Sequence, residues 1–313
     1  MSKSKQVLLI GGNGFIGSHL VDKLLAENCR VKVLDQFPER YRKPLLDVEY
    51  ILDDYGDIGV LKKALHGCDT LIHLAHVGSP ASAIKEADKE VLNSITAFVR
   101  MLEWLKGGMV GQFMFFSSGG AVYGVPDVTP VPEDYKGWPV SPYGVAKLSM
   151  EHYLHMFSAQ NQLPYQIIRP SNPYGPRQNF LGSQGAISIF THKILSGESI
   201  EIWGDGNNRK DYVYVEDLAD AVIALMENGR KKEVYNVGSG EGVSLKAIIS
   251  CIEHSCNVSA NVQYAPRRSQ DVPDIVLSCG KIKADVDWTP STALSDGIDI
   301  LRKWMQSYLK SQS

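Results

Sequence analysis

A tyrosine and a lysine four residues apart are the pair in this chain that most directly suggests chemistry. Tyr143 and Lys147 stand in the segment YGVAK, which opens a stretch with helical periodicity. Residues i and i+4 share one face of a helix, so the ammonium group of Lys147 can lie near the phenol of Tyr143. The pKa of a free tyrosine is about 10, and a neighbouring positive charge lowers it. Such a tyrosine can take a proton from a substrate hydroxyl. The same spacing also occurs on surface helices without chemistry, so the surrounding elements must decide.

A second candidate is a hydroxyl in FFSSGGAVYG, residues 115–124, where a strand-like apolar run ends in two serines and two glycines. We predict that Ser118 hydrogen-bonds the substrate oxygen and that Ser117 is structural. Gly119 and Gly120 lack a Cβ atom, which lets a ligand approach the backbone closely and permits unusual dihedral angles.

A glycine-rich turn, GGNGFIG, stands between the apolar run QVLLI and a helical pattern. Glycines at 11, 14 and 17 allow a tight turn, and a pyrophosphate can sit on the N–H groups at the start of the following helix. Asp35 ends the second apolar run. A carboxylate there accepts hydrogen bonds from both ribose hydroxyls and repels a 2′-phosphate, which favours NAD over NADP. Taken alone, Asp35 could also be a turn residue at the end of a strand.

The elements around these motifs alternate between apolar runs and helical patterns as far as about residue 172. Continuous apolar strands separated by helices predict an α/β fold with a doubly wound parallel sheet of the Rossmann type. We therefore expect an NAD-binding domain over residues 1–172. A smaller, loop-rich α/β domain with short helices is expected over 173–313, with some of its segments returning to the first domain. Ligands bind at the carboxyl ends of such strands, so residues 11–17, 35, 74–76, 117–124 and 169–175 should share one cleft.

Composition excludes some classes of function. The chain has 313 residues, of which 44% are hydrophobic and 21% charged, with a net charge of −3. This balance favours neither a nucleic-acid nor a membrane partner. The five cysteines form no Cys-x-x-Cys pair, which is typical of free thiols in a reducing compartment. The apolar run at residues 7–10 is too short for a signal peptide, and we expect a cytoplasmic protein.

The order of the motifs resembles that of the extended short-chain dehydrogenase/reductase family. GGNGFIG, LIHLAH, SSGGAVYG, YGVAK, RPSNPYGPRQ, GDGNNRKDYVYVEDLADA and APRRSQDV follow one another as they do in that family. The likeness covers nearly the whole chain and is greatest to its NAD-dependent nucleotide-sugar epimerases of the UDP-glucose 4-epimerase type. It implies an isomerase that inverts C4 of a UDP-hexose through a transient 4-ketose, with a glucose-type, N-acetylated or uronic acid sugar.

The resemblance also implies roles for individual positions. Asp54 and Tyr55 would contact the adenine end, Asn93 would lie behind the sheet edge, and Lys147 would hold the nicotinamide ribose and lower the pKa of Tyr143. The predicted catalytic residues are Tyr143, Lys147 and Ser118. The predicted cofactor-binding residues are Gly11, Gly14, Phe15, Ile16, Gly17, Asp35, Gln36, Asp54, Tyr55, Leu74, Ala75, His76, Asn93, Tyr143, Lys147 and Pro170. The predicted residues for the UDP-sugar are Ser118, Asn172, Arg209, Lys210, Arg268 and Asp271.

Two positions depart from the family pattern. Many relatives carry a catalytic serine or threonine where this chain has Gly119, and its nearest hydroxyl is that of Ser118. The family usually places arginine directly before the aspartate of the RDY-type segment, whereas this chain has Arg209 followed by Lys210. Either side chain could serve the diphosphate, although a lysine lacks the bidentate geometry of an arginine.

Other functions remain open on sequence grounds. Related dehydratases carry an Asp-Glu pair where this chain has Gly120 and Ala121, and the decarboxylase-type glutamate is missing as well, so both are disfavoured. A 4-keto reductase, or a dinucleotide-sensing binding protein on the same fold, remains possible. His152 and His155 are expected to be exposed helical residues and not metal ligands. The helices near 88–106 and 143–161 resemble the pair that forms a homodimer in the family, although helices covering their own sheet look similar.

Overall fold

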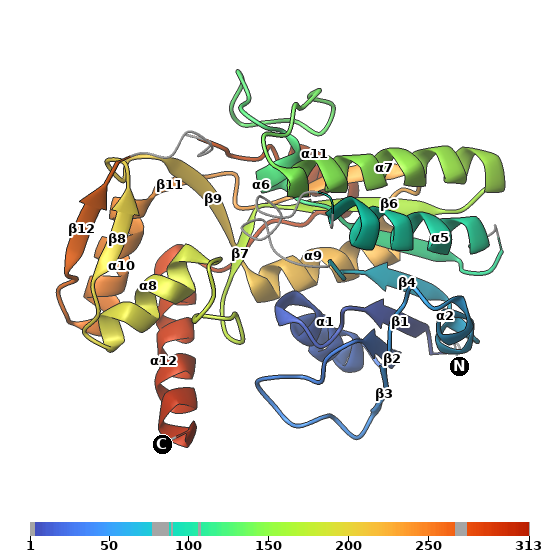
Figure 1. Ribbon diagram of the computed structural model, residues 1–313, viewed down its shortest axis with the longest axis horizontal. Helices are drawn as coiled ribbons and strands as arrows, with labels where there is room; N and C mark the ends of the chain where they lie inside the picture. Colours follow the sequence, from blue (N-terminus) through green and yellow to red (C-terminus); the bar gives the residue numbers. More distant parts are fainter. Residues whose placement is uncertain (1–3, 77–87, 89, 106–107, 267–273, 313) are drawn as a thin grey trace.

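The computed structural model describes residues 4–76, 88, 90–105, 108–266 and 274–312. Its centre is a seven-stranded sheet in the order β10-β6-β5-β4-β1-β2-β3, and all the neighbouring pairs are parallel (Figure 1). The strands are β1 (Gln6–Ile10), β2 (Arg30–Asp35), β3 (Val48–Leu52), β4 (Thr70–His73), β5 (Gln112–Phe116), β6 (Tyr165–Pro170) and β10 (Glu233–Val237). The predicted α/β fold with a doubly wound parallel sheet is confirmed.

Helices cover both faces of this sheet, which explains why its central strands are continuously apolar. One face packs against α1 (Phe15–Ala26), α9 (Val215–Asn228) and α11 (Gly280–Val286). The other face packs against α2 (Ile58–Leu65), α5 (Thr96–Trp104) and α7 (Pro142–Asn161). A π-helical turn, η1 (Glu90–Ile95), leads into α5. Figure 1 shows α5 and α7 side by side over the sheet, with α1 and α9 on its opposite side.

Local signals fix where two of these helices begin. The side chain of Asp57 accepts hydrogen bonds from the backbone N–H groups of Gly59 and Val60 at the start of α2. At the start of α7, the Ser141 side chain accepts a hydrogen bond from the N–H of Gly144, and Pro142 occupies the first helical position. Both arrangements satisfy N–H groups that have no partner within the helix.

The rest of the chain forms a second group of elements around its own apolar cluster. A three-stranded sheet consists of β11 (Gly242–Ser244), β9 (Arg209–Tyr214) and β7 (Asn172–Tyr174), and β12 (Val262–Ala265) pairs with β8 (Ile200–Trp203). The helices α8 (Ala186–Leu195), α10 (Leu245–Cys256) and α12 (Leu294–Gln312) pack on them. The last helix, with 19 residues, is longer than the short helices expected here.

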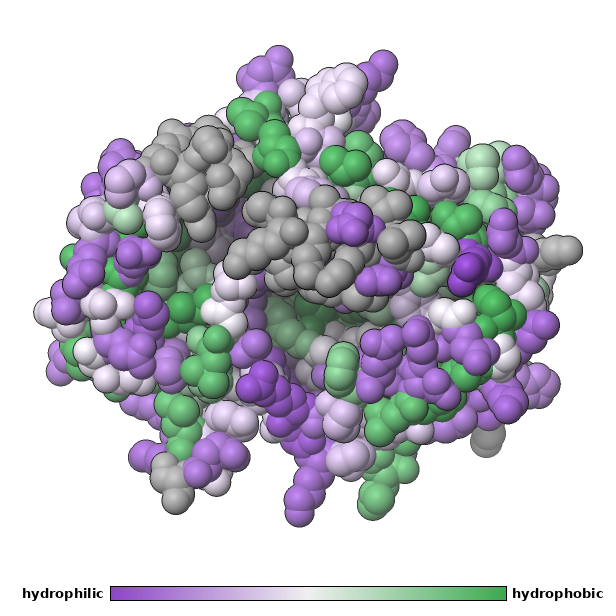
Figure 2. Space-filling model, in the orientation of Figure 1, coloured by the Kyte–Doolittle hydropathy of each residue, from purple (hydrophilic) through white to green (hydrophobic). Residues whose placement is uncertain are grey.

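The two groups are connected by segments that cross between them. The strand β10 and the helices α9 and α11 lie in sequence among the elements of the second group but pack with the central sheet. Between the regions of α8 and α1, the surface is hollowed near the centre of the face drawn in Figure 2. A division at residue 172 stays a proposal, in which these returning segments count with the first domain.

Two further observations concern the chain as a whole. No helix in the described part of the chain is long and apolar enough to cross a bilayer. The five cysteines are free thiols in the structure, two of them buried and three partly buried.

Candidate active site

The turn between β1 and α1 packs its backbone as closely as its glycines allow. A Cβ atom on Gly17 would lie 2.5 Å from the carbonyl oxygen of Gly11 and 2.6 Å from the Cα atom of Gly12. Any side chain there would push the helix away from the turn. Gly14 is the N-cap of α1, and no described side chain caps it. The first N–H groups of the helix therefore remain available to a phosphate.

Asp35 closes β2 beside this turn. Its Oδ2 atom accepts a hydrogen bond of 3.0 Å from the N–H of Asn13, and its Oδ1 atom accepts one of 3.1 Å from the N–H of Phe37. Burial raises the pKa of this carboxyl above its ordinary value. The Oδ1 atom of Asn13 is buried without a partner among the described residues. The carboxylate of Asp35 and the amide oxygen of Asn13 thus lie at the edge of the turn, where the hydroxyl groups of a ribose could donate to them.

The chain beyond β4 runs along the other side of the same turn. The N–H groups of Leu74 and Ala75 both donate to the carbonyl of Ile10, at 2.9 and 3.1 Å. The ring of His76 meets the ring of Tyr143 edge-on, with their centroids 4.6 Å apart. Burial and the positive charge of Lys147 lower the pKa of His76 to about 2, so its imidazole is neutral. The predicted residues 74–76 therefore lie between the glycine turn and the tyrosine.

Tyr143 and Lys147 project from the first turns of α7 toward the carboxyl end of β5. Lys147 is only 2% exposed, and its Nζ atom donates a 2.9 Å hydrogen bond to the carbonyl of Phe116. The same Nζ atom lies 5.9 Å from the centre of the Tyr143 ring. A positive charge at this distance favours the phenolate form of tyrosine. The spacing expected from sequence is thus realised in the structure.

The two serines that follow β5 differ in their surroundings. Ser117 is buried, and its hydroxyl donates to a carboxylate oxygen of Glu151 on α7. Ser118 is partly buried as the N-cap residue of the short helix α6 (Gly119–Val122). Its hydroxyl makes no hydrogen bond to any residue that the structure describes. Of the two, only Ser118 has a hydroxyl that is free to serve a ligand.

Gly119 and Gly120 are glycines for different reasons. A Cβ atom on Gly119 would lie 2.5 Å from Cδ1 of Leu277 and 3.1 Å from the carbonyl oxygen of Arg169, so position 119 faces packed protein. A Cβ atom on Gly120 would have Asn172 as its nearest neighbour, at 3.7 Å, an ordinary van der Waals contact, so position 120 could hold a methyl group. A side chain at position 119 would therefore have to displace the end of the Leu277 side chain.

Of the residues expected to bind the UDP-sugar, Asn172 and the Arg209–Lys210 pair are described. The amide Nδ2 of Asn172 donates 2.8 Å to the carbonyl oxygen of Asp211. Arg209 is about half exposed and forms an ion pair with Asp274, with 3.2 Å between Nη2 and Oδ2. Because successive side chains of a strand point to opposite faces, Lys210 lies on the other side of β9. Arg209 is thus engaged with Asp274, and the choice between the two cations stays open.

Asp211 is a residue that the sequence reasoning missed. It is buried, and its carboxylate accepts hydrogen bonds from the N–H and hydroxyl of Ser239 and from the N–H groups of Gly240 and Leu277. The carboxylate therefore joins β9 to the chain after β10 and to the segment before α11. Its sequence signal is an acidic residue at the start of the apolar run in KDYVYV.

The other predicted cofactor residues differ in their burial. Tyr55 is buried in the apolar core, where its ring meets His73 edge-on, and Asn93 is exposed on η1. Asp54 is exposed and accepts a hydrogen bond from the N–H of Gly56. The remaining cofactor candidates are Phe15 and Ile16, both half-buried on α1, Gln36, exposed after β2, and Pro170, buried at the end of β6. Arg268 and Asp271 lie outside the described residues.

The histidines expected on a helix surface are found there. His152 and His155 are both exposed on α7, and Nδ1 of His155 lies 3.1 Å from the hydroxyl oxygen of Tyr165. Within the described ranges, no group of three or more His, Cys, Asp or Glu residues is placed to hold a metal ion.

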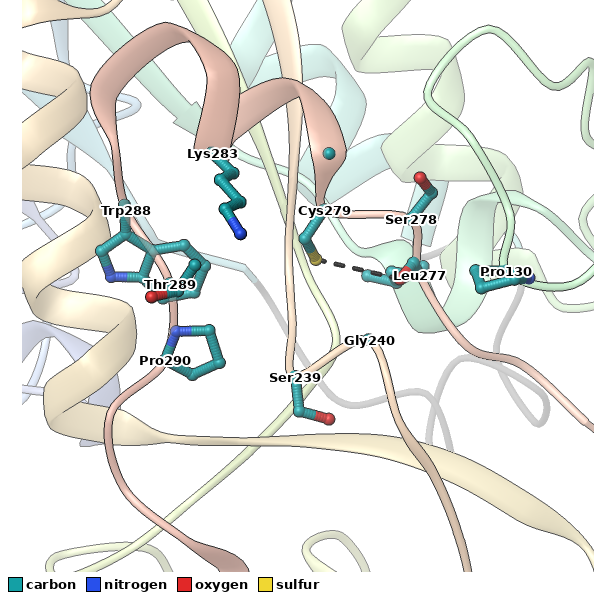
Figure 3. A pocket seen from close by; sticks show the side chains of 11 residues that line it. Pro130, Ser239, Gly240, Leu277, Ser278, Cys279, Lys283, Trp288, Thr289 and Pro290 are labelled. Carbon is teal, nitrogen blue, oxygen red and sulfur yellow. Dashed lines mark hydrogen bonds between the residues drawn. The ribbon is translucent and has the colours of Figure 1, made fainter.

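A separate pocket of about 280 Å³ opens at the carboxyl end of β10. In Figure 3 the side chain of Lys283 extends into it between Trp288 and Cys279. The thiol of Cys279 donates to the carbonyl oxygens of Gly238 and Leu277, and burial raises its pKa to about 12. No residue lining this pocket belongs to the predicted site. Leu277 lies between this pocket and the predicted site, since it lines the pocket and also packs on Gly119.

Comparison with known proteins gives consistent matches over most of the chain. The model of the NAD dependent epimerase/dehydratase family matches residues 7–238. A UDP-glucose 4-epimerase of Mycolicibacterium smegmatis is 31% identical over 302 residues, 94% of this chain and 96% of that protein. A dTDP-4-dehydro-6-deoxyglucose reductase of Escherichia coli is 32% identical over 311 residues, covering 96% and 98%. The crystal structure of UDP-glucose 4-epimerase with UDP-glucose from Thermotoga maritima is 33% identical, with a TM-score of 0.92 over 97% of this chain and 99% of that one.

Proposed function

The chain belongs to the NAD dependent epimerase/dehydratase family, and from this membership we propose that it is an isomerase that inverts C4 of a UDP-hexose through a 4-ketose. The observation that carries the proposal is the Tyr143–Lys147 pair at the carboxyl end of the central sheet. Tyr143 has the buried ammonium of Lys147 beside it, and the unengaged hydroxyl of Ser118 lies at the end of the adjacent strand.

The residues present fit the NAD that the family uses. The uncapped N-terminus of α1 suits a pyrophosphate, and the Gly17 contact leaves no side chain to obstruct it. Asp35 and the unpartnered Oδ1 of Asn13 offer acceptors to a ribose. His76 and Lys147 would lie beside the nicotinamide ribose. When bound, NAD would accept the C4 hydride and return it, so no net oxidation occurs.

The residues of the chain supply the acid–base part of the reaction. Tyr143 takes the proton of the 4-hydroxyl as the ketose forms, and it gives the proton back when the sugar is reduced on its other face. Lys147 keeps the phenol acidic through its charge. Ser118 donates a hydrogen bond to the 4-oxygen, where charge develops.

Binding of the UDP part falls to the second group of elements. Asn172 at the start of β7 contacts the sugar nucleotide, and a cation of β9 serves the diphosphate. Either Arg209, which is paired with Asp274, or Lys210, as a point charge, supplies this cation. Arg268 and Asp271 complete the proposal, although they lie outside the described residues.

The biological setting belongs to the proposal as well. We place the enzyme in the cytoplasm, as its free thiols suggest. We also propose a homodimer that joins the α5 and α7 helices of two subunits. In support, α5 and α7 lie side by side, and α7 carries exposed apolar residues.

The function is tested by incubating the purified protein and NAD with UDP-glucose, UDP-galactose and their N-acetylated and uronic acid forms. Product stereochemistry is then read by NMR. We expect inversion at C4 of at least one sugar, and we expect the Tyr143→Phe variant to lose about 10²–10⁴-fold in kcat, because its general acid–base group is gone. Conversion of none of these sugars by the NAD-loaded protein would refute the proposal.

A 4-keto reductase is the second candidate, and the relative of Escherichia coli is the observation that favours it. A reductase consumes a reduced nicotinamide for each product formed, whereas an epimerase returns its hydride. Absorbance of the reduced nicotinamide during turnover separates the two. A steady fall in step with product would assign the reductase, and a constant signal would assign the epimerase.

A further inference from the structure

A buried ion pair begins one helical turn beyond Lys147, at Glu151 of α7. Glu151 and Arg169 are 5% and 7% exposed. The guanidinium of Arg169 donates twice to the carboxylate, with Nε 3.0 Å from Oε1 and Nη2 2.5 Å from Oε2. Such a two-pronged pair fixes orientation as well as distance. It therefore couples α7, which carries Glu151, to β6, which carries Arg169.

The carboxylate of Glu151 also holds the end of β5. The residues Tyr143, Lys147 and Glu151 are spaced four apart, so all three lie on one side of α7. Lys147 donates to the carbonyl of Phe116, and the next residue, Ser117, donates its hydroxyl to Glu151. The last residue of β5 and the residue after it are thus both bonded to the helix that carries the tyrosine. Ser118 is the residue that follows them.

The guanidinium of Arg169 is hydrogen-bonded to the chain that follows Ser118. Its Nη1 atom donates 2.9 Å to the hydroxyl of Tyr123 and 3.0 Å to the carbonyl of Glu133. Ser118 is the N-cap residue of α6, and Tyr123 is its C-cap residue. The hydroxyl of Tyr123 donates a 2.6 Å hydrogen bond to Oδ1 of Asn236 on β10. The chain is therefore fixed to the same ion pair both before and after Ser118.

Stability alone does not account for charges in this place. A buried ion pair gains little over well-packed apolar residues of the same volume, because both charges lose their hydration. What a pair of this kind adds is a defined geometry for the groups bonded to it. Here those groups flank Ser118, whose hydroxyl is unengaged among the described residues, and a misplacement of about 1 Å can lower a rate about 10²-fold.

We propose that Ser117, Glu151 and Arg169 are positioning residues that hold the Ser118 hydroxyl against the oxygen that Tyr143 deprotonates. This inference rests on the proposed function. It assigns Ser117 a role through its neighbour, since its own hydroxyl is turned away toward Glu151.

The test removes one hydroxyl and leaves the ion pair intact. Ser117→Ala should lower kcat about 10- to 100-fold with little change in KM or in bound NAD. The melting temperature should fall as well, because the variant loses a hydrogen bond to a buried carboxylate. The matched control is Ser158→Ala, on α7, the helix that also carries Glu151. Its hydroxyl is equally buried and donates 2.7 Å to the carbonyl of Leu163, away from the site. The control should keep its kcat within about twofold of the wild type, inside the scatter of independent sites.

A double-mutant cycle shows whether Ser117 acts through Ser118. If it does, Ser117→Ala should change kcat less than about twofold in a Ser118→Ala background, because the hydroxyl that it positions is already absent. Equal losses in both backgrounds, equal losses for the Ser158 control, or an unchanged kcat for Ser117→Ala would each overturn the inference. The cycle requires a wild type that epimerises a UDP-sugar, so failure of the proposed function appears first and separately.

Discussion

Two neighbouring hydroxyls and two neighbouring glycines determine the chemistry at the end of β5. Ser117 faces inward to Glu151, whereas the Ser118 hydroxyl remains unengaged within the described structure. A Cβ atom at position 119 would press on Leu277, whereas one at position 120 would make an ordinary contact with the amide of Asn172. At this scale, the direction of each side chain decides what the residue can do. The motif letters alone do not give that direction.

The Gly119 contact gives a prediction for single substitutions. Gly119→Ser places a side chain 2.5 Å from Leu277, and overpacking of this kind destabilises a protein by about 1–3 kcal/mol. Calorimetric melting temperatures should therefore fall for Gly119→Ser and recover partly in Gly119→Ser/Leu277→Ala. Gly120→Ala is the matched control, because its nearest neighbour would be 3.7 Å away. A Gly119→Ser variant as stable as the control would contradict the structural explanation.

The elements explain what could be predicted from the sequence and what could not. The strands of the central sheet and the helix that carries Tyr143 and Lys147 follow from local periodicity, so both were predictable. The partners of Glu151 and Asp211 were not, because they lie on other elements. Arg169 is 18 residues from Glu151, and Leu277 is 66 residues from Asp211. No local pattern reports which distant backbone groups a buried carboxylate will meet.

Asp211 gives a prediction about the joining of elements. Its carboxylate accepts four hydrogen bonds from Ser239, Gly240 and Leu277. In Asp211→Asn, an NH₂ group replaces one of the two accepting oxygens. That group cannot accept the hydrogen bonds that the oxygen accepted, so they are lost. Hydrogen bonds to a buried charge contribute about 1.5–3 kcal/mol each, so we expect the free energy of unfolding in urea to fall by about 3 kcal/mol. Asp205→Asn, on an exposed loop, should change it little. Equal effects of the two variants would exclude a special role for Asp211.

The whole molecule contains three histidines that folding keeps neutral. Burial lowers the pKa of His19 to about 4, of His73 to about 3 and of His76 to about 2. In the unfolded chain a histidine has a pKa of about 6.5, so the unfolded state binds protons that the folded state does not. Their contribution to stability is complete above about pH 6.5 and decreases as the pH falls toward the folded values.

His73 offers the sharpest test of this pH dependence. Its ring lies among Tyr55, Phe98 and Phe115, and neither ring nitrogen has a partner in the described structure. His73→Phe keeps the ring and removes the titrating group. Between about pH 7 and about pH 5.5 it should lose about 1 kcal/mol less unfolding free energy than the wild type. The exposed His152, changed to Phe, should follow the wild type. Identical slopes for all three proteins would refute the assignment to His73.

The proposed dimer is tested at the same scale. Val145, Tyr153 and Met156 of α7 are 50%, 40% and 41% exposed. Tyr153→Glu combined with Met156→Glu should convert a dimer into a monomer in sedimentation experiments, because two charges would be buried in each subunit's contact. Ile300→Glu, at a similarly exposed apolar position of α12, should remain dimeric. A dimer that survives the double change would place its contact elsewhere.

The contact between Gly119 and Leu277 also constrains the history of the chain. An ancestor with a hydroxyl at position 119 needed a smaller or displaced side chain at position 277, because the two cannot occupy the same space. A side chain at 119 and leucine at 277 therefore disfavour each other, and a return to serine at 119 alone should cost stability in this chain. We expect these two positions, far apart in sequence, to change together along the branches of the family.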